Sequence, residues 1–326
     1  MTRPKTLPAF TTEQLKRAHA ALAAKVALMM GRKFEEGDWA GVYCTAKGIP
    51  NTGWSNLKLD IVHEGLGVEH KMLRYTDKPD ITSICGTRHM HPSATRSFRM
   101  PPVSTDPNEA MRQVLTQYAE YIESRRLVVQ SSVDTGQIAD LRTGWLIWQS
   151  SLKQFLYFEE EMLAPNPDEY FAEWNIREPR GERKGSTNLW IYEKDTRQKR
   201  YSITNEAGSK IQPYFDVPPA SDNNLYLFTV IGEYIDIDHV RVWVTRSTLR
   251  ELESLIGSTE TEAISQSIIN ATKRMSEVKS VEYVTKENVI PVIITASAYA
   301  ALTSALPSSS DEHCFQQLAD FLRAKV

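Results

Sequence analysis

The sequence predicts a mixed α/β (α+β) fold, in which helices flank a mixed sheet and a β-rich region with C-terminal helices follows. Three observations support this class. Apolar residues recur at helical spacing after Thr11 and after Pro107, and they alternate with polar residues at strand spacing between residues 57 and 73. Paired strand patterns return after residue 185. We expect two domains, residues 1–180 and residues 181–326.

The composition is that of a chain with a substantial core. Its 326 residues are 41% hydrophobic and 24% charged, enough for one large domain or two ordinary ones. No apolar stretch approaches the roughly 18 uncharged residues that a membrane span needs, and the N-terminus lacks the apolar core of a secretory signal. Three widely spaced cysteines argue against a disulfide framework. These features predict a cytoplasmic protein without a membrane partner.

Helices are the main elements expected before residue 165. Thr11 or Thr12 can cap a helix that runs to about Phe34, and Asp106-Pro107 can begin another that ends near Arg126. The segment LVVQSSV after it is expected to be a short strand. A third helix, rich in Trp and Leu, is expected from about residue 138 to residue 163.

Strand pairs and three closing segments are expected after residue 185. NLWIYEKDTRQKRYSIT and NLYLFTVIGEYIDIDHVRVWVT each contain two strand patterns. A helix near 259–278, an apolar run that begins near residue 287 and a final helix from Asp311 complete the chain. We expect no repeat of fixed period.

Two extended runs can pair as a hairpin in NLKLDIVHEGLGVEHKML, residues 56–73. If Glu64-Gly65 forms a two-residue turn, His63 pairs with Leu66 and Ile61 with Val68. The same register sets Asp60 opposite Glu69, where Cβ atoms are about 4.5 to 5.5 Å apart. Two carboxylates at that distance repel each other unless a positive charge lies between them.

Two interpretations account for these charges. In the first, Lys58 and Lys71 neutralise an exposed charge ladder on an ordinary hairpin. In the second, Asp60 and Glu69 hold Mg²⁺, which takes one or two carboxylates and keeps several waters for a substrate phosphate. Lys71 shares the face of Glu69, so it would lie beside the metal and orient or deprotonate a water.

Asp60, eight intervening residues and then Glu69-His70-Lys71 resemble the D-(x)n-(D/E)-x-K motif of the PD-(D/E)xK nuclease superfamily. Type II restriction endonucleases are its best-known members. The match covers only the hairpin, and Leu59 stands where the family has proline. In that superfamily the motif lies on two adjacent antiparallel strands of a mixed sheet flanked by helices. The preceding helix often adds another acid, for which Glu36 (or Glu35) is the candidate.

The resemblance implies a Mg²⁺-dependent endonuclease that cleaves double-stranded DNA, in its specific form a type II restriction endonuclease. Asp60 and Glu69 would be the metal ligands, and Lys71 and Glu36 would complete the catalytic set. A palindromic target would favour a homodimer. Two alternatives stay open: a non-catalytic DNA-binding or defence-accessory protein, and a nuclease of the same fold that acts on RNA or modified DNA.

A basic stretch follows the hairpin. GTRHMHPSATRSFRMPP contains Arg88, His91, Arg96 and Arg99 and no acid. Such side chains can contact phosphates or read guanine in the major groove. The alternative is a loop held by Arg–carboxylate pairs within the fold.

A second basic cluster lies in REPRGERK, residues 177–184. Arg180, Glu182 and Arg183 resemble the arginine–acid–arginine element with which one restriction-enzyme branch reads CCGG-type sites. Ile176 stands where that branch has a catalytic lysine, so a solvated charged turn is the preferred interpretation. Arg197 and Lys199 extend the positive charge into the next hairpin, which is either a DNA-facing element or an ordinary exposed one.

Overall fold

The computed structural model confirms the mixed α+β class for the residues it describes, which are 5–29, 32–50, 59–76, 80–92, 98–133, 138–179, 185–204, 209–273, 289–306 and 310–324. The α helices are α1 (Thr12–Ala27), α2 (Glu36–Lys47), α3 (Pro107–Gln130), α4 (Arg246–Ile256), α5 (Thr261–Thr272), α6 (Ala296–Ala305) and α7 (Asp311–Arg323). The strands are β1 (Thr6–Leu7), β2 (Ile61–His63), β3 (Leu66–Tyr75), β4 (Arg88–Met90), β5 (Asp140–Gln149), β6 (Gln154–Glu161), β7 (Tyr170–Arg177), β8 (Ser186–Glu193), β9 (Lys199–Thr204), β10 (Lys210–Asp216), β11 (Tyr226–Thr229), β12 (Glu233–Tyr234), β13 (His239–Thr245) and β14 (Val289–Thr295).

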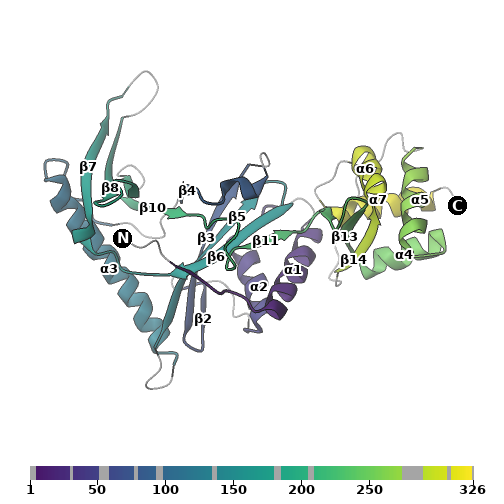
Figure 1. The fold of residues 1–326 in the computed structure, drawn as a ribbon, viewed down its shortest axis with the longest axis horizontal. Helices are drawn as coiled ribbons and strands as arrows, with labels where there is room; N and C mark the ends of the chain where they lie inside the picture. The colour runs from purple at the N-terminus through teal and green to yellow at the C-terminus, as the bar shows by residue number, and fades with distance from the viewer. Residues whose placement is uncertain are drawn as a thin grey trace.

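A six-stranded mixed sheet forms the centre of the molecule. Its strand order is β1-β6-β5-β3-β2, and β11 also pairs with β6. The pair β3 and β5 is parallel, whereas the other pairs in this sheet are antiparallel. A parallel connection needs a crossover, and α3 lies in the segment that joins the two strands. Figure 1 shows this sheet between two outer parts of the molecule.

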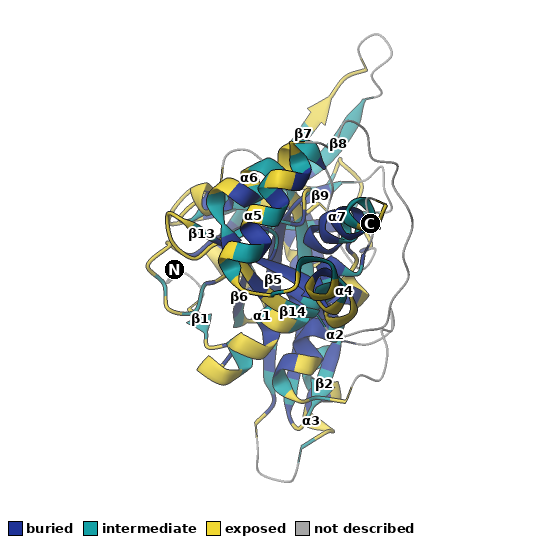
Figure 2. Cartoon of the chain, turned by 90° about the vertical axis from the view of Figure 1, so that its right-hand side faces the viewer, coloured by how far each residue is buried: buried dark blue, intermediate teal, exposed yellow. Residues whose placement is uncertain are grey.

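The central sheet is covered on both faces, because alternate residues of each strand point to opposite sides. On β3, Val68 and His70 face α1 and α2, where His70 lies edge-on to the rings of Trp39 and Tyr43. Leu73, two residues beyond Lys71, packs on the opposite face. Figure 2 shows the resulting layer of buried residues in the sheet.

A second, antiparallel sheet has the order β4-β10-β9-β8-β7. Helix α3 spans the two sheets. Met111 and Val114 in its first half pack on the second sheet, whereas Ile122 and Val129 in its second half pack beside β5. The helix therefore fixes the distance between the sheets and the space that they enclose.

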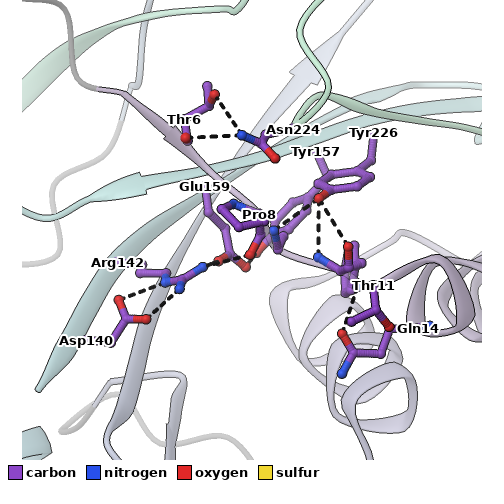
Figure 3. A network of polar contacts seen from close by, with 12 residues as sticks. Thr6, Pro8, Thr11, Gln14, Asp140, Arg142, Tyr157, Glu159, Asn224 and Tyr226 are labelled. Carbon is purple, nitrogen blue, oxygen red and sulfur yellow. Dashed lines mark hydrogen bonds and ion pairs between the residues drawn. The ribbon is translucent and has the colours of Figure 1, made fainter. Parts of the chain in front are cut away.

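The N-terminal segment is tied across the central sheet (Figure 3). The Arg142 guanidinium donates to the carbonyl of Pro8 at 3.0 Å, to buried Glu159 at 2.9 Å and to Asp140 at 2.8 Å. The Tyr226 hydroxyl accepts the backbone N–H of Ala9 at 3.1 Å. Since both anchors lie on the sheet, they hold the start of α1 against it.

Residues 233–324 form a separate unit at one end of the molecule, with its own core of Val, Ile and Leu (Figure 1). The expectation of no fixed-period repeat is wrong here. The elements β13, α4 and α5 begin at residues 239, 246 and 261, and β14, α6 and α7 begin 50 positions later, at 289, 296 and 311. Identical residues at this spacing include Val242 and Val292, Thr245 and Thr295, and Leu252 and Leu302.

The two halves of this unit are related as by a two-fold axis. Val242 pairs with Val292, its own equivalent, in the antiparallel β13–β14 ladder. Helix α4 packs on α7, and α6 packs on α5. The hydroxyls of Thr245 and Thr295 cap the helices that follow the two strands, each by accepting a backbone N–H at 3.2 Å. The sequence repeat was missed because few side chains are identical.

Three further sequence predictions differ from the structure. Residues 138–163 do not form a helix, because residues 140–149 and 154–161 are the strands β5 and β6. LVVQ is the last turn of α3, not a strand. The predicted boundary at residue 180 divides the second sheet, since β4 and β7 precede it and β8, β9 and β10 follow it. The structure instead separates the unit that begins at β12.

The state of the cysteines and the lengths of the helices bear on two further sequence predictions. The thiols of Cys44, Cys85 and Cys314 are free, and Cys44 and Cys314 are buried. Among the described residues, no helix is both long enough and apolar enough to cross a membrane. The three thiols therefore form no disulfide framework.

Candidate active site

The hairpin has the predicted turn and register. His63 pairs with Leu66 and Ile61 with Val68. Glu64 and Gly65 have positive φ angles of 44° and 81°, as a type I′ turn requires. The strand β2 begins only at Ile61, so Asp60 lies just before the ladder rather than in it.

The Asp60 carboxylate is fixed by the backbone of β3. Its Oδ2 accepts the N–H of His70 at 2.6 Å. That N–H would otherwise donate to a carbonyl of a longer β2 strand, so the side chain replaces a ladder bond. This contact brings the carboxylate beside the Glu69-His70-Lys71 segment.

Glu69 and Lys71 lie together on the face of β3 opposite His70. Lys71 Nζ is 2.7 Å from Glu69 Oε1, and their side chains are only 14% and 6% exposed. The Tyr121 hydroxyl, from α3, donates to the same oxygen at 3.4 Å. The arrangement holds the Glu69 carboxylate in one place at the edge of the space beneath α3.

Asp60 lies in an unfavourable environment for a negative charge. Burial raises the pKa of its carboxyl to about 6, and the negative charges of Glu69 and Glu36 act in the same direction. The His70 N–H and the Lys71 ammonium oppose this increase in pKa. Glu36 lies exposed in the first turn of α2, close enough for its charge to act on Asp60. A bound cation would stabilise the ionised form of Asp60.

The donor set fits Mg²⁺ with few protein ligands. Among the residues the structure describes, no three His, Cys, Asp or Glu side chains form a cluster that could hold a metal. The carboxylates at the hairpin are those of Asp60 and Glu69. Mg²⁺ accepts a set of two carboxylates when waters and a phosphate complete its coordination shell. His70 is no ligand here, because its buried ring packs against Trp39 and Tyr43 of α2, on the face of β3 opposite Glu69 and Lys71.

A cavity of about 520 Å³ opens from Glu69 and Lys71 towards the second sheet. It contains functional candidates that the sequence interpretation missed, because Glu160 lies in the segment that was predicted to be a helix. On β6, Glu160 lies in register with Thr143 of β5 and so with Glu69 of β3. The available signal was the short, aromatic-rich apolar run FLYF directly before these acids, which is typical of a buried strand. From the other sheet come Arg200 and Asp216, whose side chains approach to 3.4 Å.

Arg88 and His91 are not placed as DNA-binding residues. Arg88 makes a two-pronged ion pair with Asp216, with Nε–Oδ1 at 2.7 Å and Nη2–Oδ2 at 2.8 Å. The alternative of an Arg–carboxylate pair within the fold therefore describes Arg88. His91 is only 3% exposed, and its Nε2 is 3.1 Å from the carbonyl oxygen of Met72. Burial therefore leaves almost none of the His91 side chain accessible to DNA.

The remaining predicted DNA contacts have mixed outcomes. Arg99 and Arg197 are exposed, and the Arg197 guanidinium lies over the ring of Phe171 at 4.6 Å from its centroid. Lys199 Nζ lies 3.1 Å from the ring centroid of Trp190, and burial lowers the pKa of this lysine. Arg96, Arg180 and Arg183 lie outside the described residues.

Comparison with known proteins identifies no related protein. No family model, curated protein or solved structure matches the chain.

Proposed function

We propose that the chain is a Mg²⁺-dependent endonuclease that hydrolyses phosphodiester bonds of double-stranded DNA. The observation that carries the proposal is the meeting of Asp60, Glu69 and Lys71 at one hairpin. Two features argue against a purely structural role. Both members of the Glu69–Lys71 pair are nearly buried, and burial of Asp60 raises the pKa of its carboxyl, so these charges lie in an unfavourable environment.

The side chains have separate roles in this proposal. Asp60 and Glu69 would hold the metal, with Asp60 oriented by the His70 N–H and Glu69 by Tyr121. When bound, Mg²⁺ supplies positive charge to the phosphoryl oxygens and lowers the pKa of an attached water. Lys71 is a donor beside Glu69, where it can orient the attacking water or neutralise charge on the phosphate.

Target recognition falls to two exposed cations and one half-buried cation in this proposal. Arg99, Arg197 and Lys199 are the candidates within the described residues. With a net charge of −3, the chain has no overall attraction for DNA, so binding would depend on such local contacts. A type II restriction endonuclease is the specific form that we propose.

The test is incubation of the protein with long unmodified plasmid and phage DNA, with Mg²⁺ and with EDTA. We expect discrete fragments with Mg²⁺ alone. Retention of DNA without cutting under both conditions would instead support a non-catalytic DNA-binding protein. Cutting of RNA or of modified DNA only would keep the active site and replace the substrate.

A further inference from the structure

The cavity beside Glu69 and Lys71 is too small for a DNA duplex. Its volume of about 520 Å³ equals that of a sphere about 10 Å across, whereas the major groove alone is about 12 Å wide. The volume lies within the range of about 300 to 1,000 Å³ that is usual for small-molecule sites. A duplex can therefore meet this space only from outside, and one nucleotide can enter it.

The reacting groups open into this cavity. Glu69 and Lys71 are among its lining residues, and their side chains are only 6% and 14% exposed. A phosphate that reaches them must therefore be presented through the cavity mouth. A nucleotide that leaves the base stack brings its own phosphate closer to such a recessed site than a paired one does.

The charge of the lining excludes a phosphate from the interior. Six carboxylates face three cations around the cavity. The carboxylates are Glu69, Glu160, Glu161, Glu169, Glu193 and Asp216, and the cations are Lys71, Arg88 and Arg200. Arg88 and Arg200 are both paired with Asp216, at 2.7 and 3.4 Å. The excess of acceptors suits the amino and ring N–H groups of a base.

Aromatic side chains complete the lining. Tyr118 and Tyr121 of α3, Tyr201 of β9 and Trp145 of β5 all border the cavity. The Trp145 indole N–H donates to Glu160 at 2.9 Å, which fixes both groups at the wall. Stacking of a base on an aromatic side chain is worth about 1 to 3 kcal/mol. Apolar rings beside hydrogen-bond acceptors are the combination that binds a base rather than a sugar-phosphate.

We propose that this cavity receives the base of one nucleotide, turned out of the duplex or supplied by a single strand, while its phosphate lies at Glu69 and Lys71. This inference rests on the proposed nuclease function and specifies its substrate. The base enters between the central sheet and the second sheet, beneath α3. Base extrusion would make unpaired or mismatched DNA the preferred ligand, because the cost of unpairing is then small.

The test measures binding in EDTA, so that it does not depend on cutting. Fluorescence anisotropy would give the affinity of the full-length protein for one mixed sequence as single strand, as mismatched duplex and as fully paired duplex. We expect at least tenfold tighter binding of the first two. Equal affinity for all three, or no binding of any, would overturn the proposal.

A variant that blocks the cavity tests whether the base binds there. Ala164 is exposed at the cavity lining, and Ala164→Trp adds bulk there without entering the core. Ala220→Trp makes the same change at an exposed position outside the lining. We expect Ala164→Trp to abolish the preference for unpaired DNA and Ala220→Trp to keep it. Preference retained in Ala164→Trp would place the base elsewhere, and Mg²⁺-dependent cutting of plasmid by the unmodified protein separately tests the nuclease function.

Discussion

Single charges decide whether the hairpin is an active site. Asp60→Asn and Glu69→Gln keep the shape of each side chain and remove a metal-binding charge, and Lys71→Ala removes the ammonium group. We expect each to cost at least about 3 kcal/mol of transition-state stabilisation, or roughly a 100-fold loss of cleavage rate. The measurement is the rate of plasmid cutting, with circular dichroism as the check on folding.

The matched control lies on the same hairpin. Glu64 is at the turn, its side chain is 86% exposed and Glu64→Gln should cut as the unmodified protein does. Near-normal cutting by Glu69→Gln would show that the metal is held by other residues.

A second residue-scale prediction concerns Asp311, whose carboxylate accepts the N–H groups of Gly232 at 3.2 Å and Trp243 at 3.4 Å. Burial raises the pKa of this carboxyl to about 7, against these N–H groups and the charge of Lys153. Between about pH 4 and pH 7 the folded state therefore binds a proton that the unfolded state has released, so stability falls as the pH rises through that window.

We expect Asp311→Asn to remove this part of the pH dependence. The amide still accepts both N–H groups, and it carries no charge at pH 8. The free energy of unfolding from urea titrations should then be at least about 1 kcal/mol higher than that of the unmodified protein at pH 8, with a smaller gain at pH 5. Asp320→Asn, on the half-exposed side of the same helix, is the control. A parallel pH profile for Asp311→Asn would exclude this carboxyl as the cause.

At the scale of elements, the close packing of β5 on its neighbours requires glycine at residue 144. A Cβ atom there would lie 2.4 Å from the Tyr157 hydroxyl oxygen and 2.7 Å from His70 Cδ2. We expect Gly144→Ala to lower the free energy of unfolding by about 1 to 3 kcal/mol, the usual cost of overpacking. Gly37 in α2 has nothing within 4 Å of a Cβ position, so Gly37→Ala should raise stability by up to about 1 kcal/mol. Equal unfolding midpoints in urea for the two variants would contradict this account.

The elements that the sequence predicted well are those with local signals. The hairpin turn was predicted because Glu64-Gly65 has turn chemistry, and α3 because Asp106 and Pro107 begin it. The strands β5 and β6 were mistaken for a helix because a strand buried on both faces reads as a continuous apolar run. Trp145 and Trp148, three apart, fit a helix face but pack on opposite sides of the sheet.

At the scale of the whole molecule, the cavity could not be predicted because its walls are distant in sequence. Arg88 and Asp216 are 128 positions apart, and only the packing of two sheets along α3 brings them to one space. The local site, Asp60 with Glu69 and Lys71, needed only one turn and one register. Local sequence patterns therefore predict the hairpin but not the cavity, which depends on tertiary contacts.

A further prediction concerns the number of copies that act on DNA. The described part of one chain has one such hairpin, whereas the two strands of a duplex run in opposite directions, so two copies related by a two-fold axis could cut both strands together. We expect nicked plasmid to accumulate at low protein concentration and linear plasmid to dominate at high concentration. Sedimentation of the complex with DNA should show two chains. Linear product at concentrations where a single chain is bound would argue for sequential cutting by a monomer.

The 50-residue repeat of the C-terminal unit has a consequence for its ancestry. Each half is completed by the other: Ser265 of the first half accepts the N–H of Thr295, and Glu312 of the second accepts the N–H of Thr245. A lone half would leave these N–H groups without an acceptor and its apolar strand face uncovered. Two identical halves could each supply the missing acceptor and cover the strand face of the other. The unit therefore has the form that gene duplication and fusion give to a small symmetric dimer, in which each half has since diverged.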